Sequence, residues 1–152
     1  MPILLVQGCS KTKKSVSEPV EAFELYEGYY YKIIKKAIRQ NEFNANIDMC
    51  ILSAEHGLLD PDDSITTYDR KMNRKRAENL REDVISGLQM RIKNNGYDTV
   101  LLNLGETYQR AVAGLESQTD ATVKTIEGGL GERGHYLKNV IRGDMSPLIS
   151  EA

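Results

Sequence analysis

The chain has 152 residues, of which 40% are hydrophobic and 28% charged, and its formal net charge is −2. A chain of this length buries roughly 70% of its unfolded surface, so it needs neither a disulfide framework nor a structural metal in order to fold. The small net charge excludes binding to nucleic acid or to an anionic membrane through bulk charge, so any such contact requires a local basic patch.

Four apolar runs alternate with four helical patterns along the chain. The runs predict strands over residues 2–8, 47–53, 98–104 and 121–126, and the patterns predict helices over 21–40, 73–93, 105–115 and 132–141. Residues 54–68 are expected to form one long loop. Gly28 falls inside the first predicted helix, where a glycine costs about 1 kcal/mol relative to alanine. Asn73 is expected to cap the second helix, and residues 94–96 to end it.

This alternation predicts an α/β protein. We expect one domain over residues 1–143, with a three-layer Rossmann-like fold whose mostly parallel four-stranded sheet is flanked by helices, and a C-terminal tail over 144–152. The loops after the four strands then meet at the carboxyl edge of the sheet, where α/β folds bind their ligands.

The two cysteines do not suggest a disulfide framework, and the apolar run 3–6 is too short for a signal or membrane segment. We therefore expect a reduced, cytoplasmic protein without a membrane partner. Cysteines and histidines are not clustered at the spacing of metal ligands, so we predict neither a metal nor another cofactor.

The loop after the first strand carries Cys9, Lys11 and Lys13. A lysine there could bind a phosphate or carboxylate, or act as a nucleophile if burial lowers its pKa; a solvated basic loop is the simpler interpretation. Cys9 could be a nucleophile if the lysines lower its pKa, but a half-buried end of a strand is favoured. The glycine spacing excludes a phosphate-binding P-loop.

The loop after the second strand carries Ser53, His56, Tyr68 and Asp69. His56, with Ser53 beside it, is a candidate general acid or base, and a histidine that hydrogen-bonds its own loop is an equally weighted alternative. Tyr68 and Asp69 could bind a ligand by stacking and hydrogen bonding, or could pack the loop and cap the next helix.

Two further patterns suggest anion binding. The dense basic run could contact a phosphate backbone, although a solvated helix face is favoured; it consists of Arg70, Lys71, Arg74, Lys75 and Arg76. The glycine-rich stretch 128–134 includes Gly129 and Gly131, whose backbone N–H groups could bind an anion. Close helix–sheet packing explains these glycines equally well, and their spacing gives weak support to a dinucleotide site.

Five segments, taken in chain order, resemble the small, largely uncharacterised branch of the YaaA-like superfamily. They are residues 8–13, 22–26, 51–61 with 68–69, 104–108 and 128–131, and the S-A-x-H-G-L-L-x-P…Y-D pattern is the most specific among them. The longer YaaA proteins are linked to peroxide stress and are thought to bind DNA. The superfamily is also similar to a domain of archaeosine synthase, which modifies a deazaguanine base in transfer RNA. Its P-C-x-x-x-K motif is matched in spacing by Cys9 and Lys13, with Gly8 in place of the proline.

The resemblance and the loops together predict a protein that acts on a nucleobase, nucleotide or nucleic acid, with glycosylase-like or base-modifying activity. The candidate catalytic residues are Lys13, Ser53, His56 and Asp69. The candidate substrate-binding residues are Cys9, Lys11, Glu24, Gly57, Tyr68, Gly105, Tyr108, Gly129 and Gly131. The alternatives are a non-enzymatic DNA-binding protein of the oxidative stress response, which would use the basic run, and a small-nucleotide sensor. The oligomeric state stays open.

Overall fold

The computed structural model describes residues 2–149. The strands are β1 (Ile3–Gly8), β2 (Val20–Glu21), β3 (Ile47–Ser53), β4 (Gly57–Leu59), β5 (Ser64–Ile65), β6 (Thr99–Asn103) and β7 (Thr122–Thr125). The α-helices are α1 (Ala22–Leu25), α2 (Tyr29–Arg39), α3 (Arg74–Asn95), α4 (Glu106–Gln109), α5 (Leu130–Ile141) and α6 (Ser146–Ile149). Two 3₁₀ turns, Arg110–Val112 and Leu115–Ser117, follow α4.

The central sheet has five strands in the order β4-β3-β1-β6-β7. β1, β3, β6 and β7 are parallel, and β4 folds back antiparallel to β3, so the prediction of a four-stranded sheet is wrong by one edge strand. The prediction of a loop over 54–68 is also wrong for two short stretches, because β5 pairs with β2 in a separate ribbon. The return to β4 depends on Gly57, whose φ of 73° is favourable only for glycine.

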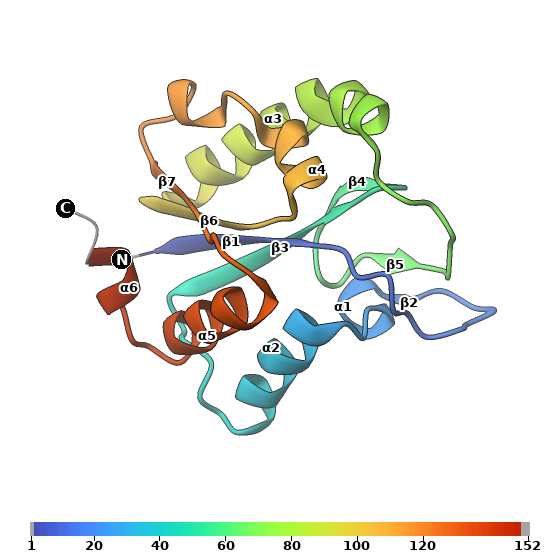
Figure 1. The fold of residues 1–152 in the computed structure, drawn as a ribbon, viewed down its shortest axis with the longest axis horizontal. Coiled ribbons are helices and arrows are strands. Elements are labelled where there is room, and N and C mark those ends of the chain that lie inside the picture. The colour runs from blue at the N-terminus through green and yellow to red at the C-terminus, as the bar shows by residue number, and fades with distance from the viewer. Residues whose placement is uncertain (1, 150–152) are drawn as a thin grey trace.

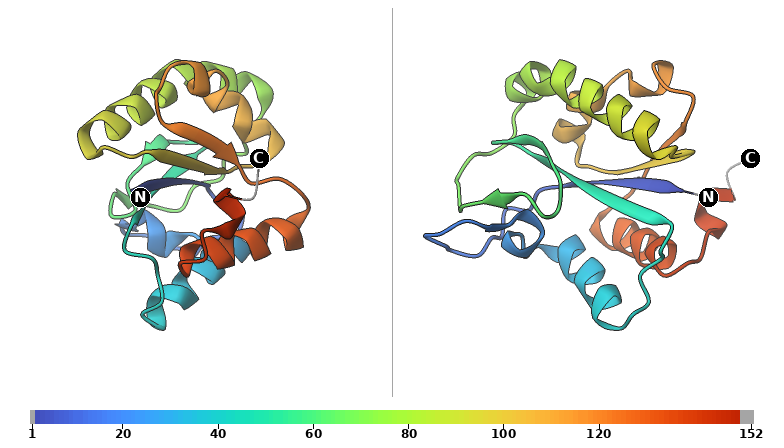
Figure 2. Two further views of the ribbon diagram at one scale, coloured as in Figure 1. Left: turned by 90° about the vertical axis from the view of Figure 1, so that its left-hand side faces the viewer. Right: turned by 180° about the vertical axis from the view of Figure 1, so that it is seen from behind.

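Helices cover both faces of the sheet. α3 and α4 lie on one face and α2 and α5 on the other, as Figure 1 shows and the two views of Figure 2 confirm. Side chains of β1 alternate between the layers, as strand geometry requires. Leu4 and Val6 join the core beneath α3, whereas Ile3 and Leu5 join the core beneath α2 and α5. The two cores fix β1 and its neighbours, whose carboxyl ends carry the loops discussed below.

The prediction of one helix over 21–40 is wrong, because the chain leaves the helical conformation between α1 and α2. Tyr26 has extended backbone, with ψ of 133°, and forms a β-bridge with Lys13. Gly28 is the N-cap of α2 rather than an interior residue, and its N–H donates to Ser10 Oγ at 3.0 Å. A Cβ on Gly28 would lie 2.7 Å from Ser10 Cβ, so the close approach of these two segments requires glycine.

The helix predicted over 105–115 is too long, because α4 ends at Gln109 and two 3₁₀ turns follow it. The boundaries of α3 and α5 agree more closely with the predictions. Asn73 caps α3 by accepting a hydrogen bond from the N–H of Arg76, and Gly96 ends that helix in the left-handed conformation. The predicted tail over 144–152 contains α6, and residues 150–152 lie outside the described part. Within residues 2–149, the structure contains no helix that is long and apolar enough to cross a membrane.

Candidate functional site

A cavity of about 660 Å³ opens beyond the carboxyl ends of β1 and β6. Three segments form its walls: the loop after β1, the chain between β5 and α3, and the start of α4. The lining residues are Cys9, Ser10, Lys11, Lys13, Thr67, Tyr68, Asp69, Arg70, Lys71, Met72, Gly105, Glu106, Thr107 and Tyr108. Three of the four strand-end loops expected from the sequence therefore meet at one cavity.

The loop after β1 is fixed from two sides by hydrogen bonds. The N–H of Lys14 donates to the carbonyl of Leu25, and the N–H of Glu27 donates to the carbonyl of Thr12, both at 2.9 Å. Thr67 joins this loop to the opposite wall, because its hydroxyl donates to the carbonyl of Lys14 at 2.7 Å and accepts from the N–H of Val16 at 2.9 Å. The cavity walls are thus held by the protein itself.

Tyr68 lies at the centre of the polar contacts at this edge. Its hydroxyl is 2.6 Å from the Tyr26 hydroxyl and 2.9 Å from Ser53 Oγ. The Lys13 ammonium lies 4.6 Å from the centre of its ring, and the His56 ring meets it edge-on at 5.3 Å. Burial raises the pKa of Tyr68, and burial likewise raises the pKa of Tyr26 to about 12. Both phenols therefore stay protonated at neutral pH.

Ser53 supports the turn that follows β3. Its side chain is fully buried, and its Oγ accepts hydrogen bonds from the N–H groups of Glu55 at 3.2 Å and His56 at 3.1 Å. Because two amides occupy its lone pairs, its own O–H is left to donate to Tyr68. Ser53 orients Tyr68 and the turn, and it does not line the cavity.

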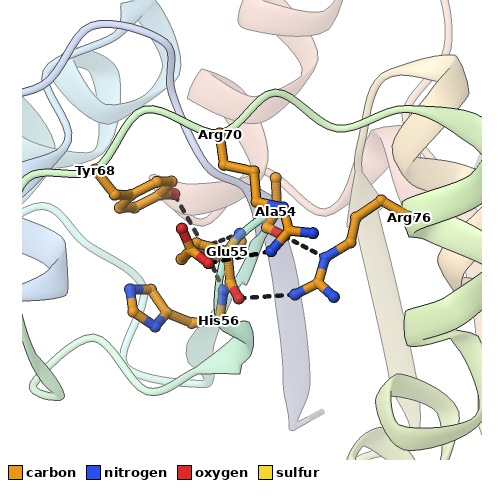
Figure 3. Close-up of polar contacts among 7 residues, drawn as sticks. Ala54, Glu55, His56, Tyr68, Arg70 and Arg76 are labelled. Carbon is orange, nitrogen blue, oxygen red and sulfur yellow. Dashed lines mark hydrogen bonds and ion pairs between the residues drawn. The ribbon is translucent and has the colours of Figure 1, made fainter.

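An arginine pair completes the same turn, as Figure 3 shows. Arg76 Nε donates to the carbonyl of Ala54 and Arg76 Nη2 to the carbonyl of Glu55, each at 2.8 Å. Arg70 Nη1 lies 3.2 Å from the carboxylate of Glu55. Two arginines of the predicted basic run therefore have acceptors within the protein itself.

A thiol and a phenol also meet in the cavity lining. Cys9 Sγ lies 3.0 Å from the Tyr108 hydroxyl, and burial raises the pKa of Tyr108. Cys9 is half-buried, whereas Cys50 is fully buried in the core beneath α3. The cavity thus combines a thiol, the ammonium of Lys13, neutral phenols and the carboxylates of its rim, which together can supply a nucleophile, hydrogen-bond donors and acceptors.

The structure brings half of the predicted site residues together. Those that line the cavity are Cys9, Lys11, Lys13, Tyr68, Asp69, Gly105 and Tyr108, with Arg70 and Lys71 from the basic run. His56 is exposed beside Tyr68 and outside the lining, and Gly57 is buried in β4.

Five predicted residues lie elsewhere. Glu24 is exposed on α1, where its carboxylate is 3.9 Å from the ammonium of Lys14. Gly129 caps α5, and Gly131 lines a separate hollow between α2 and α5. Arg74 pairs with Glu78 along α3 at 3.3 Å. Lys75 is exposed on α3, outside the cavity lining.

Sequence reasoning did not find several residues that shape this edge. The missed lining residues are Ser10, Thr67, Met72, Glu106 and Thr107. A buried polar chain was missed as well: Arg133 donates twice to Asn103 Oδ1, at 3.1 and 2.8 Å, and Asn103 donates to Gln7 at 2.8 Å. This polar chain could have been predicted from Gln7 and Asn103, because each places an amide side chain near the end of an apolar run.

A group of exposed carboxylates lies apart from the cavity, in the turn after β4. Asp60, Asp62 and Asp63 could be brought around one cation. Asp60 instead pairs with Arg91 at 3.0 Å, and Asp63 accepts from the N–H of Asp60 at 2.8 Å. These contacts assign the first and third carboxylates to the structure of the turn.

Comparison with known proteins places the chain among proteins of unknown function. The crystal structure of AF0587, a protein of unknown function, superposes with a TM-score of 0.52 at 15% identity, over 91% of this chain. The chain spans 44% of the length of that protein, and the likeness shows the fold alone. No curated protein matches the chain. Residues 3–139 match the family of unknown function DUF6884, and the chain therefore belongs to that family.

Proposed function

We propose that the chain acts in the cytoplasm on a nucleobase, presented as a nucleotide or within nucleic acid, in the cavity beyond β1 and β6. The observation that supports this most is the mixture of side chains in that cavity. The rings of Tyr68 and Tyr108 stand among four cationic side chains, those of Lys11, Lys13, Arg70 and Lys71. Aromatic rings bind bases by stacking, and cations bind the phosphates attached to them.

The size of the cavity supports the same proposal. Pockets for small ligands measure about 300–1,000 Å³, and this one measures about 660 Å³. An enzyme that modifies or releases a base must take that base out of the stack and enclose it. A cavity at the carboxyl edge of a mostly parallel sheet also fits the Rossmann-like fold and the YaaA-like kinship, which form part of this proposal.

The proposed roles follow from the contacts of each side chain. Lys13 reaches the cavity over the face of Tyr68. It binds the phosphate, or its amine attacks the sugar carbon while the bond from that carbon to the base nitrogen breaks, and the base leaves with the amine proton. Asp69 accepts a hydrogen bond or a proton from the base. Ser53 and His56 act through Tyr68, which both of them contact, and are positioning residues. The reaction in this proposal is base release or base modification.

Two neighbouring lysines provide a matched test. Lys13 lines the cavity, whereas Lys14 is exposed, lies outside the lining and faces Glu24. The proteins Lys13→Met and Lys14→Met lose the same charge and gain the same side chain. Each is incubated with nucleosides, nucleotides and single-stranded oligonucleotides; calorimetry measures binding, and mass spectrometry measures base release or a change in base mass.

We expect Lys13→Met to weaken binding by at least tenfold and to stop product formation, with Lys14→Met within twofold of the unchanged protein. Equal behaviour of the two variants would refute the role of Lys13. If the unchanged protein neither binds nor alters any of these compounds, the proposed function is wrong.

A second candidate is non-enzymatic DNA binding through the basic run. Lys75 favours it, because it is exposed at the start of α3 and lies outside the cavity lining. In that case Arg74→Gln with Lys75→Gln abolishes DNA binding, and Lys13→Met has no effect on it. The reverse pattern supports the cavity.

A further inference from the structure

Lysines and arginines greatly outnumber acidic residues in two helices that share one face of the molecule. α2 and α5 lie side by side on the face of the sheet opposite α3 (Figures 1 and 2). Residues 29–39 and 130–142 contain seven lysines and arginines and a single glutamate, although the whole chain has a net charge of −2. We call the surface formed by these two stretches the α2–α5 face. Such an asymmetry creates a local positive field on a chain that is otherwise acidic.

The cations of the α2–α5 face gather around two adjoining hollows. A hollow of about 320 Å³ between the helices is lined by Tyr29, Lys36, His135, Lys138 and Arg142, among others. Lys36 also borders a second hollow of about 360 Å³ along α2, with Lys32 and Arg39. The basic groups therefore lie along one continuous track.

Most of these cations have no acidic partner. Within residues 2–149, Lys32, Lys36, Arg39 and Lys138 form no ion pair, and only Arg142 of this track is paired, with Glu42. In the predicted basic run, by contrast, the guanidinium groups of all three arginines contact acceptors of the protein. Lys35 and Arg133 of the α2–α5 face also have acceptors, the carbonyl of Tyr26 and the side chain of Asn103. The charge that this face offers to an external polyanion therefore comes from its four unpaired cations.

An aromatic ring stands among the cations. Tyr29 is 44% exposed and lies across α5 at Gly134, where a Cβ would come within 2.4 Å of the tyrosine hydroxyl. Leu130, at the start of α5, is 60% exposed. Cations that follow a backbone, interleaved with an exposed aromatic ring, are the combination that binds single-stranded nucleic acids.

The α2–α5 face begins next to the cavity. The N–H of Gly28, the N-cap of α2, donates to Ser10 Oγ, and Ser10 lines the cavity. Lys36 lies eight residues further along, which corresponds to about 12 Å of helix axis. That length matches the rise of roughly three to four stacked nucleotides. A strand that leaves the cavity can therefore reach the track within a few nucleotides.

We propose that the α2–α5 face binds the phosphate backbone of a single-stranded nucleic acid whose target base occupies the cavity. The inference rests on the proposed function, because it specifies the form in which the base arrives: within a polynucleotide rather than as a free nucleotide. Lys32, Lys36 and Lys138 contact successive phosphates, and Tyr29 stacks against a base outside the cavity.

The test compares two double substitutions that remove the same charge. Lys36→Gln with Lys138→Gln neutralises the track, and Lys14→Gln with Lys93→Gln neutralises two exposed lysines that lie outside both the cavity lining and the track. Fluorescence anisotropy measures the binding of a 12-nucleotide single strand at several salt concentrations. The same proteins are titrated with a 5′-mononucleotide and with anionic lipid vesicles.

We expect the Lys36/Lys138 pair to reduce the slope of log K against log salt by about 1.4, because each lost phosphate contact contributes roughly 0.7 for a single strand. This corresponds to binding about 25-fold weaker at 0.1 M salt, with mononucleotide binding unchanged. The Lys14/Lys93 pair stays within twofold of the unchanged protein.

Several outcomes overturn the inference. They are equal losses in the two pairs, no loss in the Lys36/Lys138 pair, no binding of the single strand at 50 mM salt, and a loss confined to vesicle binding. If the mononucleotide binds in a manner that requires Lys13 and the 12-nucleotide strand binds no tighter, the α2–α5 inference fails and the proposed function stands. If the strand depends on Lys36 and Lys138 but not on Lys13, the face stands and the cavity proposal fails.

Discussion

Replacing Ser53 by alanine tests whether this buried hydroxyl holds the edge of the cavity together. The change removes three hydrogen bonds, to the N–H groups of Glu55 and His56 and to the hydroxyl of Tyr68. Each hydrogen bond contributes about 1 kcal/mol net, so the total loss is about 3 kcal/mol. Because His56 is exposed, water can hydrogen-bond to its backbone amide in the variant and so replace part of the lost stabilisation. We therefore expect the free energy of unfolding to fall by about 2–3 kcal/mol.

Urea denaturation measures this loss, and the melting temperature should fall by about 6–9 °C for a chain of this size. Ser86→Ala is the matched control, because Ser86 is exposed on α3. The control should change stability by no more than about 0.5 kcal/mol. A loss below 1 kcal/mol for Ser53→Ala, or one equal to that of the control, would refute the supporting role of Ser53.

Three further changes test the surroundings of the cavity. Burial raises the pKa of Tyr26 to about 12, so the folded protein retains this proton to higher pH than the unfolded chain. The contribution of Tyr26 to the free energy of unfolding should therefore be constant below pH 10. It should fall by about 1.4 kcal/mol per pH unit between pH 10 and 12. Tyr26→Phe should remove this contribution to the slope of the free energy of unfolding against pH, as measured by urea denaturation. A slope equal to that of the unchanged protein would contradict the raised pKa of Tyr26. Gly28→Ala places a Cβ 2.7 Å from Ser10 Cβ and should cost about 2 kcal/mol by thermal unfolding; a neutral result would contradict the close packing. Arg76→Met removes both hydrogen bonds to the turn after β3 and should lower the free energy of unfolding by about 2–3 kcal/mol. The control Lys75→Met should lower it by less than about 0.5 kcal/mol. Similar losses in the two variants would show that the two hydrogen bonds contribute little.

The main strands could be predicted because a parallel sheet buried on both faces is built from continuous apolar runs. β3 covers the predicted residues, Ile47–Ser53, and β1 begins one residue later than predicted. β4 has only three residues and β5 only two, too few to show a period of their own. Their position depends on the backbone of Gly57 and on pairing with segments elsewhere in the chain.

The interruption at Gly28 shows a different limit of sequence reasoning. The apolar spacing from residue 22 to 38 fits one helix, and a single glycine costs a helix only about 1 kcal/mol. What breaks the helix is the contact of Gly28 with Ser10 and the bridge from Tyr26 to Lys13. Both involve residues 13 to 18 positions away, so the local pattern contains no signal of them.

The candidate site was predicted to the extent that topology alone determines it. Parallel strands bring their carboxyl ends to one edge, so the convergence of Cys9, Lys13, Tyr68 and Tyr108 follows from strand order. Adjacency in sequence was less informative. Ser53 points into the protein and His56 out of it, although only two residues separate them.

The division between fixed and free groups at this edge bears on how a ligand is selected. The Tyr68 hydroxyl lies 2.6 Å from the Tyr26 hydroxyl, and the Tyr108 hydroxyl lies 3.0 Å from Cys9 Sγ. Thr67 ties the loop after β1 to the segment that carries Tyr68. Preorganised groups of this kind lose little entropy on binding and so define the shape of what can enter. Lys11 and Lys71 are exposed at the rim, where long cationic side chains adjust to a phosphate at varied positions. Under the proposed function, we therefore expect the rigid aromatic interior to discriminate among bases more strictly than the adaptable cationic rim discriminates among the phosphate chains that carry them.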